Sequence, residues 1–359
     1  MQFNDVYRGR RVMVTGHTGF KGSWLSLWLN QLGAELVGYS LEAPTTPNHL
    51  QLLSIPMHSV TGDVRDAEKL SLTINEFQPE IVFHLAAQPL VRLSYRNPNE
   101  TISTNIQGTL NVYEACRMTP SVRSIVSITS DKVYQNLETS DGYCESDRLG
   151  GADPYSCSKA CVELISESYR KSFFESEDSL LLATVRAGNV IGGGDWAEDR
   201  IVPDAVRAAA DGKPLLLRNP EAVRPWQHVL DPLAGYLLVG EKLIQRERTA
   251  AAPWNFGPNQ SDAVSVIQLA EAMRSCWQDV EPEICREEKA PHETRLLHLD
   301  STRAKQCLSW NPVWPWDVAI QKTTNWYKNY YLNGSCDTAR DLDCYLEDAS
   351  AANLTWLTA

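Results

Sequence analysis

The sequence has no long apolar run and no leader pattern of an exported protein. None of its hydrophobic stretches is long enough to cross a bilayer. The N-terminal residues, Met1 to Arg11, are polar and lack the apolar centre of a signal peptide. We therefore expect a cytoplasmic protein that has no membrane partner.

Cysteine is present but lacks the patterns that give it a special role. The nine cysteines are odd in number and scattered, and none of their spacings is that of a zinc site. Cys157 and Cys161 are merely one helical turn apart. We expect reduced thiols and no bound metal.

Positive charge is in deficit. Lys and Arg number 33 against 45 Asp and Glu, which gives a formal net charge of -12. This balance argues against a nucleic-acid partner bound through a broad basic face. An anionic small ligand remains compatible with it, because a few arginines in one cleft are enough to bind such a ligand.

The first half of the chain alternates short β-rich runs with amphipathic helices. Strands with almost no polar alternation, separated by helices, are typical of a parallel sheet covered on both faces. We therefore predict an α/β fold with a Rossmann-type doubly wound sheet, whose ligands bind at the carboxyl ends of the strands. The expected strands are 11–15, 35–40, 58–60, 80–87, 124–129 and 180–185, and the expected helices are about 22–32, 67–77, 99–117 and 155–174.

A glycine-rich loop joins the first predicted strand to the first predicted helix. It contains Gly16, Gly19 and Gly22, which allow a sharp turn and let a pyrophosphate approach the backbone near Phe20. Glycine repeats also occur in ordinary turns, but this one directly follows an N-terminal buried strand. The loop therefore predicts a dinucleotide cofactor.

The end of the second strand indicates which dinucleotide is bound. An acidic residue there binds the ribose hydroxyl of NAD, and an arginine accommodates the extra phosphate of NADP. Residues 39–43 contain no arginine, which favours NAD. Glu42 is a candidate for the ribose contact, although a solvated loop glutamate explains it equally well.

Acid-base groups gather in the sequence around the fifth strand. Tyr155 and Lys159 have i, i+4 spacing and project from one helix face, where a cationic environment would help Tyr155 accept a hydroxyl proton. Ser130 supplies the hydroxyl partner at the strand end, and Asp131 and Lys132 add further acid-base groups. The alternatives are a surface Tyr–Lys pair and a strand-end turn with solvated charges.

These motifs resemble the NAD-dependent epimerase/dehydratase family of extended short-chain dehydrogenases/reductases over roughly residues 10–316. Residues 128–134 are similar to the Thr-Asp-Glu segment of nucleotide-sugar 4,6-dehydratases, with Ser130 for Thr and Lys132 for Glu. The Asp-Lys pair and segments 17–24 and 224–228 look like the branch that acts on CDP-glucose. The substitution at Lys132 puts a simple copy of the dTDP-glucose mechanism in doubt.

The resemblance also implies ligand contacts outside the acid-base residues. Asp63 would meet the adenine amine and Val64 the ring, while simple packing remains an alternative for Ala86 and Ala87. His228 and Asp231 would either contact substrate or only order their loop. Trp254 would begin a lid strand whose residues would be either core or contact residues. The implied cofactor residues are Gly16, Gly19, Phe20, Gly22, Asp63, Val64, Leu85, Ala86, Ala87, Tyr155 and Lys159, and the implied substrate residues are Gln88, Asn189, Arg200 and Arg224.

The implied reaction is the dehydration of CDP-glucose in deoxysugar and lipopolysaccharide biosynthesis. Tyr155 removes the O4 proton as the C4 hydride passes to NAD. Lys132 then takes the C5 proton, Asp131 protonates the departing C6 hydroxyl, and the hydride returns to C6. The alternatives are a dTDP- or GDP-sugar dehydratase, a nucleotide-sugar 4-epimerase, which would not need Asp131 and Lys132, and a non-catalytic NAD-sensing protein, against which Ser130, Tyr155 and Lys159 together argue.

The family resemblance and the change in composition after Arg186 imply three regions. Glycines and prolines break the later chain into short elements. We expect an NAD-binding domain with the catalytic residues at 1–186, a substrate-binding lid interleaved with the sheet at 187–335, and a tail without a motif at 336–359. A homodimer or larger homo-oligomer, built from paired long helices, is also implied.

Overall fold

The computed structural model describes residues 2–138, 141–285 and 297–357. Its centre is a seven-stranded sheet with the order β11-β6-β5-β4-β1-β2-β3, in which every neighbouring pair is parallel. The predicted doubly wound α/β fold is therefore confirmed. The strands are β1 (Arg11–Thr15), β2 (Glu35–Ser40), β3 (His58–Thr61), β4 (Ile81–His84), β5 (Ser124–Ile128), β6 (Leu181–Arg186) and β11 (Pro253–Asn255).

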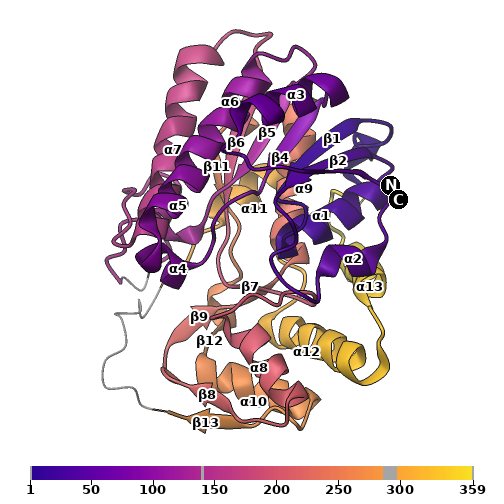
Figure 1. Cartoon of the computed structure of the whole chain (residues 1–359), viewed down its shortest axis with the longest axis vertical. Helices are drawn as coiled ribbons and strands as arrows, with labels where there is room; N and C mark the ends of the chain where they lie inside the picture. The colour runs from indigo at the N-terminus through magenta and orange to yellow at the C-terminus, as the bar shows by residue number, and fades with distance from the viewer. Residues whose placement is uncertain (1, 139–140, 286–296, 358–359) are drawn as a thin grey trace.

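Helices cover both faces of this sheet (Figure 1). On one face α3 (Ala67–Phe77), α6 (Gly108–Arg117) and α7 (Pro154–Phe173) bury an apolar cluster that includes Met13 and Tyr113. On the other face α1 (Phe20–Gln31), α9 (Leu230–Ile244) and α13 (Thr338–Ala351) share a second cluster. Burial on both faces explains why the inner strands are mostly apolar, whereas the edge strand β3 is polar and largely exposed.

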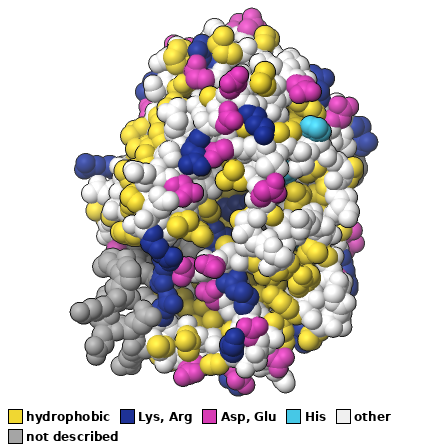
Figure 2. All heavy atoms as spheres, in the orientation of Figure 1, with side chains coloured by type: hydrophobic (Ala, Val, Ile, Leu, Met, Phe, Trp, Pro, Cys, Tyr) yellow, Lys and Arg dark blue, Asp and Glu magenta, His cyan; other side chains and the backbone are white. Residues whose placement is uncertain are grey.

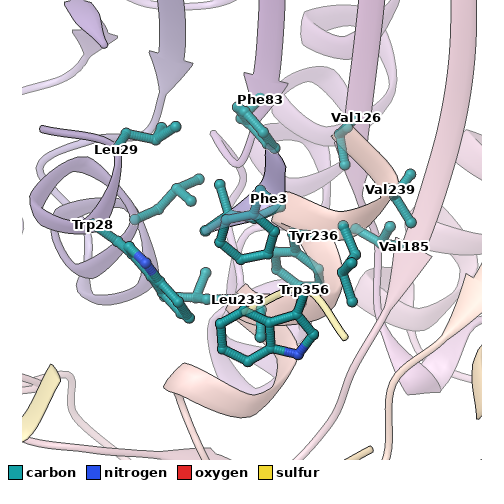
Figure 3. Packing of buried hydrophobic residues seen from close by; sticks show 14 of the residues in the cluster. Phe3, Trp28, Leu29, Phe83, Val126, Val185, Leu233, Tyr236, Val239 and Trp356 are labelled. Atoms are coloured by element: carbon teal, nitrogen blue, oxygen red, sulfur yellow. The ribbon is translucent and has the colours of Figure 1, made fainter. Parts of the chain in front are cut away.

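The two ends of the chain meet in the second cluster. The rings of Phe3 and Trp356 stack with centroids 5.0 Å apart, and Trp28 from α1 packs against both (Figure 3). Each of these fully buried aromatic side chains stabilises the fold by roughly 2–3 kcal/mol through loss of apolar surface from water. The C-terminal segment is thus part of the body that carries the sheet.

A smaller part of the molecule lies beside the N-terminal end of α1 (Figure 1). It has its own apolar cluster, which includes Val206, Met273 and Trp326. Trp24 of α1 joins the two parts, because its Nε1 donates a hydrogen bond to the Gly193 carbonyl at 2.8 Å. The elements of the smaller part are α8 (Ile201–Ala210), α10 (Val266–Cys276), α12 (Trp316–Asn333) and three strand pairs, β7 (Val190–Ile191) with β10 (Gln227–His228), β9 (Val223–Pro225) with β12 (Ala263–Ser265), and β8 (Leu215–Leu217) with β13 (Pro282–Ile284).

Short helical segments complete the structure. The helical stretch predicted at 99–117 is α5, a π-helical turn and α6 in direct succession. No helix in the described ranges combines the length and the apolar character needed to cross a membrane. The short segments are α2 (His49–Leu53), α4 (Val91–Arg96), α5 (Pro98–Ile102), the π turn (Ser103–Gln107) and α11 (Thr302–Leu308).

The expected lid strand that begins at Trp254 is wrong. Residues Pro253–Asn255 form β11, which extends the central sheet and pairs in parallel with β6, with Trp254 opposite Val185. Trp254 is 2% exposed in the sheet-side cluster. The reason is topological: α9 packs against the sheet and returns the chain to its edge, so the next apolar run adds a parallel strand beside β6.

Candidate active site

The turn between β1 and α1 is shaped for close approach of a ligand to the backbone. Gly16 has φ +75°, and a Cβ there would lie 2.7 Å from the Ala86 nitrogen. A Cβ on Gly22 would lie 2.1 Å from the Gly16 oxygen. No side chain caps α1, which begins directly after Gly19. The first-turn N–H groups are therefore suited to a pyrophosphate, and the turn fits the predicted dinucleotide.

Hydrogen bonds between polar side chains connect the ends of the neighbouring strands beside this turn. His17, buried under β2, is hydrogen bonded through Nδ1 to Ser40 at 2.8 Å and through Nε2 to Ser59 at 2.7 Å. Burial lowers the pKa of His17 to about 4, so the ring is neutral. Glu42 is exposed and accepts a hydrogen bond from the Thr61 hydroxyl at 3.2 Å.

Asp63 and Val64 follow β3, where the adenine end of the cofactor is expected. Both carboxylate oxygens of Asp63 accept hydrogen bonds from Arg65, which holds the pKa of Asp63 below its usual range. Val64 is buried, and its carbonyl accepts a hydrogen bond from Asn111 at 2.9 Å. The segment is thus fixed against α6, and its contact with adenine stays a prediction.

The segment after β4 lies against the cofactor turn. The backbone nitrogens of Leu85 and Ala86 donate to the Thr15 carbonyl and hydroxyl at 3.1 and 3.2 Å. Ala87 comes next, and Gln88 is 7% exposed. The Gln88 amide donates to Thr101 at 2.7 Å and accepts from the Leu90 backbone at 2.6 Å. Gln88 therefore shapes this turn, and its role toward substrate remains a prediction.

Ser130, Tyr155 and Lys159 meet at the carboxyl end of β5. Tyr155 is the second residue of α7, and Ser130 precedes the 3₁₀ turn η3 (Asp131–Val133). Ser130 lies near enough to Tyr155 to lower the pKa of its hydroxyl, and Lys159 Nζ donates a hydrogen bond to the Ile128 carbonyl at 3.1 Å. All three side chains are at least nine-tenths buried. The predicted acid-base residues thus form one cluster next to the end of the sheet.

Burial dominates the proton affinity of this cluster. It raises the pKa of Tyr155 to about 12, against the lowering effects of Ser130 and Arg200. It lowers the pKa of Lys159 to about 8, against the raising effect of Glu163. The protein's own groups therefore favour a phenol at Tyr155, which differs from the expectation that the neighbouring lysine favours tyrosinate. The positive charge of the oxidised nicotinamide would act in the other direction.

The carboxylate of Asp131 fits into space left by a glycine on the opposite segment. Its Oδ1 accepts a hydrogen bond from Ser130 at 2.9 Å, and it is 5% exposed. A Cβ on Gly188 would lie 1.9 Å from Oδ2 of Asp131. The absence of a side chain at position 188 therefore makes the space for this carboxylate. Lys132, the next residue of the turn, is partly exposed, and its backbone nitrogen donates to Ser130 at 3.2 Å.

The predicted substrate residues of the later chain occupy different places. Arg200 pairs with Asp195 at 2.7 Å, and its charge affects the pKa of Tyr155, so the structure brings it to the acid-base cluster. Asn189 has φ +51° and follows Gly188 directly. Arg224 is on β9, with Nη1 donating to the Val223 carbonyl at 2.9 Å.

His228 and Asp231 order their surroundings. The His228 ring packs edge-on against Trp24 and Trp314, with centroids 5.7 and 4.7 Å away. Asp231 Oδ1 accepts hydrogen bonds from the Val313 backbone at 2.7 Å and the Tyr345 hydroxyl at 2.9 Å. Of the two roles left open by the sequence, these contacts support the ordering role.

A buried ion pair behind Lys159 was not predicted from the sequence. Glu163, one turn further along α7, accepts two hydrogen bonds of 2.9 Å from Arg186, and both side chains are 2% exposed. Thr129 and Thr184 donate to the same carboxylate at 2.5 and 2.7 Å. The i, i+4, i+8 spacing of Tyr155, Lys159 and Glu163 was the available signal.

Lys21 is a second residue that the sequence analysis left unassigned. It lies in the first turn of α1, and the charges of Asp131, Lys159, Asp195 and Arg200 all affect its pKa. Figure 2 shows a hollow near the middle of the visible face with Lys and Arg side chains in it. A lysine inside a phosphate-binding loop was the available signal.

The fold and this cluster together define a nucleotide-dependent enzyme of the doubly wound class. The chain belongs to the NAD-dependent epimerase/dehydratase family, whose model matches residues 12–250. Membership confirms the predicted family and the NAD cofactor. A relative with full-length similarity is the CDP-glucose 4,6-dehydratase of Salmonella typhimurium, 47% identical over 330 residues, which cover 90% of this chain and 92% of that protein.

Solved structures support the fold. The UDP-glucose 4-epimerase of Thermotoga maritima, solved with UDP-glucose, has a TM-score of 0.77 at 23% identity over 89% of this chain and 99% of its own. The dTDP-glucose 4,6-dehydratase of Bacillus anthracis, solved with NAD, has a TM-score of 0.73 at 22% identity over 89% of this chain and 97% of its own.

Proposed function

We propose that this protein is an NAD-dependent CDP-glucose 4,6-dehydratase, which converts CDP-D-glucose to CDP-4-dehydro-6-deoxy-D-glucose. The observation that carries the proposal is the 47% identity to the Salmonella typhimurium enzyme over nine-tenths of the chain. The adjacent acid-base groups support it, because loss of water needs a base at C5 and an acid at the C6 oxygen in addition to a group at O4.

The oxidation step uses the buried cluster. The turn of Gly16, Gly19 and Gly22 would hold NAD, which would supply a reversible acceptor for the hydride that leaves C4 and returns to C6. Tyr155 takes the O4 proton, and Ser130 orients its hydroxyl. Lys159, fixed to the Ile128 carbonyl, supplies a positive charge that favours the deprotonated form of Tyr155 during this transfer.

The elimination step uses the turn after β5. The C4 ketone acidifies the C5 hydrogen, which Lys132 removes, and Asp131 protonates the departing C6 hydroxyl, which leaves as water. When the hydride returns to C6, Lys132 gives the proton back to C5. The Ser130 hydroxyl donates a hydrogen bond to Asp131 and lies near Tyr155, so it stands between the residues of the two steps. The absence of a side chain at Gly188 leaves room for the Asp131 carboxylate.

Substrate contacts complete the proposal. Arg200 lies close to Tyr155 and is suited to orient the sugar or its diphosphate, and Arg224 offers a guanidinium for the diphosphate. Asn189 and Gln88 are the remaining proposed substrate residues. The proposed division of the chain is a sheet domain at 1–186, a mostly substrate-binding lid interleaved with the sheet at 187–335, and a C-terminal segment at 336–359, whose helix α13 packs in the same apolar cluster as α1 and α9.

The test is incubation of the purified protein with CDP-, dTDP-, UDP- and GDP-glucose separately. The 4-keto product absorbs strongly in alkali, and only CDP-glucose is expected to give it. Substrate deuterated at C4 is expected to carry the label to C6. Formation of a C4 epimer without loss of water would establish the 4-epimerase alternative, and product from another nucleotide would reassign the substrate.

The proposed assembly is a homodimer or larger homo-oligomer in the cytoplasm, where it serves deoxysugar and lipopolysaccharide biosynthesis. The outer faces of α5 and α7 expose Ile102 and Leu164, at 45% and 55%. The nine free thiols suit a reducing compartment. Light scattering of the protein as it elutes from a size-exclusion column measures the molar mass of the assembly. Leu164→Glu is expected to reduce this mass to that of one chain.

A further inference from the structure

Gln227 connects two backbone segments that leave the central sheet side by side. It is the first residue of β10 and is fully buried. Its Nε2 donates hydrogen bonds to the Gly188 carbonyl at 3.1 Å and to the Phe256 carbonyl at 3.0 Å. Gly188 comes shortly after the end of β6, and Phe256 directly follows β11, the neighbour of β6 in the sheet. One amide group therefore fixes the chain just beyond two neighbouring strands.

The backbone of Gln227 adds a third hydrogen bond to the same region. Its nitrogen donates to the Asn189 carbonyl at 3.3 Å, so the carbonyls of Gly188 and Asn189 are both held by one residue. Gln227 Oε1 is buried and has no hydrogen-bond partner among the described residues. The side chain therefore contributes through its two N–H groups, and an apolar side chain of similar size would remove the donor to both carbonyls.

The Gly188 segment meets the proposed acid of the elimination step. A Cβ at Gly188 would lie 1.9 Å from Asp131 Oδ2, so this carboxylate lies directly against the glycine backbone. The other carboxylate oxygen, Oδ1, accepts a hydrogen bond from the Ser130 hydroxyl at 2.9 Å. Asp131 is thus confined on one side by its own turn and on the other by a backbone segment whose carbonyl is bound to Gln227.

The loss of water is the step that is most sensitive to the place of this carboxyl. The electron pair left at C5 after proton removal forms the C5–C6 double bond. The C6–O bond breaks with its electrons on oxygen, and the proton of the Asp131 carboxyl bonds to that oxygen, so water leaves. A displacement of about 1 Å can slow such a transfer about 100-fold. Oxidation at C4 does not use Asp131 and should not depend on its place.

We propose that Gln227 is a positioning residue for the loss of water: its amide holds the Gly188 segment against Asp131 and so fixes the acid at the C6 oxygen. This inference rests on the proposed function, in which Asp131 is the acid. It adds a residue from β10 that acts on the turn after β5 through the backbone after β6.

A single-turnover measurement separates the two chemical steps. CDP-glucose is mixed rapidly with excess enzyme, and NADH is followed at 340 nm, where its rise reports oxidation at C4 and its decay follows the loss of water. Gln227→Met keeps the length of the side chain and removes both donors. We expect the rise to stay within about twofold of wild type and the decay to slow about 10–100-fold. Gln51→Met, at an exposed glutamine of α2, should change neither rate.

A change of leaving group tests whether Gln227 acts through the acid. CDP-6-deoxy-6-fluoroglucose gives the same 4-keto product, but fluoride leaves without a proton. Gln227→Met should therefore convert the fluoro substrate within about threefold of the wild-type rate, because this reaction does not need the acid. Asp131→Asn should show the same pattern. If Gln227→Met slows both substrates equally, Gln227 only supports the site as a whole and the proposal is wrong.

The double variant gives an independent test. Once Asp131→Asn has removed the acid, adding Gln227→Met should not slow the loss of water further. Independent, multiplying losses would contradict the proposal. Should Gln227→Met fail to fold, Gln227→Leu carries the same predictions. No 4-keto product from CDP-glucose with the wild-type enzyme would contradict the proposed function, whereas an active wild type with equal losses on both substrates would contradict only the role of Gln227.

Discussion

At the scale of single residues, the site depends on positions where one atom more or less changes the chemistry. Tyr155 illustrates this, because its hydroxyl is the group proposed to take the O4 proton. We expect Tyr155→Phe to reduce kcat by about 10²–10⁴-fold, the usual range for a lost acid-base group. Binding of CDP-glucose, followed by calorimetry, should change little. Near-normal turnover would mean that the acid-base cluster has been placed wrongly.

Gly188 is the opposite case, in which the site depends on the absence of a side chain. A Cβ at this position would lie 1.9 Å from Asp131 Oδ2, so Gly188→Ala must displace the carboxylate. We expect elimination to slow by at least about tenfold, while NADH formation from bound substrate continues. Rapid-mixing absorbance at 340 nm separates the two steps. An equal loss of rate in NADH formation and in elimination would show that the substitution disturbs the whole site.

Sequence patterns at this scale found the residues whose signals are local. The glycines of the cofactor turn and the Tyr155–Lys159 pair have spacings fixed by one turn or one helix. Lys21 and Arg200 could not be assigned to the same cluster, because their meeting depends on how α1 and the segment before α8 pack. Spacing along the chain carries no information about such contacts.

At the scale of elements, α7 carries acid-base residues on one continuous face. Tyr155, Lys159 and Glu163 follow each other at intervals of one turn, and Glu163 anchors this face to Arg186 of β6. Most strand ends were predicted to within one residue because a buried strand is a distinct apolar run, but the strand expected at 80–87 ends at His84, since the small apolar residues after it form the turn beside the cofactor loop. The three-residue strand β11 was not, because so short a run has no periodicity and only its pairing with β6 defines it.

Glu163 should set the upper pH limit of activity. Its negative charge raises the pKa of Lys159, which burial lowers to about 8. Glu163→Gln removes that charge, so Lys159 should lose its proton at lower pH. We expect the alkaline limb of kcat to shift by about 0.5–1 unit toward lower pH.

The matched control for Glu163 lies on the same helix. Glu167, one turn further along, is half-exposed and paired with Lys171, so Glu167→Gln should leave the profile unchanged. Because Glu163→Gln leaves Arg186 buried without its partner, Glu163→Gln with Arg186→Met should be compared as well. An unshifted limb in both Glu163 variants would contradict an electrostatic role for Glu163.

At the scale of the whole molecule, buried histidines make the fold sensitive to acid. Each is hydrogen bonded or packed in its neutral form and is at most 2% exposed. Burial lowers their pKa values to about 3 or 4, below the ordinary value of 6.5. The unfolded chain therefore binds more protons than the folded chain below pH 6.5. The four residues are His17, His49, His84 and His228.

Two buried carboxyls oppose this effect. Burial raises the pKa values of Asp231 and Asp341 to about 7, so the folded chain keeps their protons where the unfolded chain has lost them. The unfolded chain gains four protons on the histidines and lacks two that the folded chain keeps on the carboxyls, so it binds two more protons than the folded chain. We expect the free energy of unfolding to fall by roughly 2–3 kcal/mol for each pH unit between pH 6.5 and 4.5.

Urea unfolding at several pH values between 6.5 and 4.5 measures how the free energy of unfolding changes with pH. Two substitutions should change this dependence in opposite directions. His49→Gln removes a proton that the unfolded state gains, so the dependence should become shallower by about 1.4 kcal/mol per pH unit. Asp231 Oδ2 is buried and finds no hydrogen-bond partner among the described residues. Asp231→Asn removes a proton that the folded state keeps, so the dependence should steepen by a similar amount. Parallel curves for wild type and both variants would show that these buried groups do not control acid unfolding, and that the surface carboxylates do.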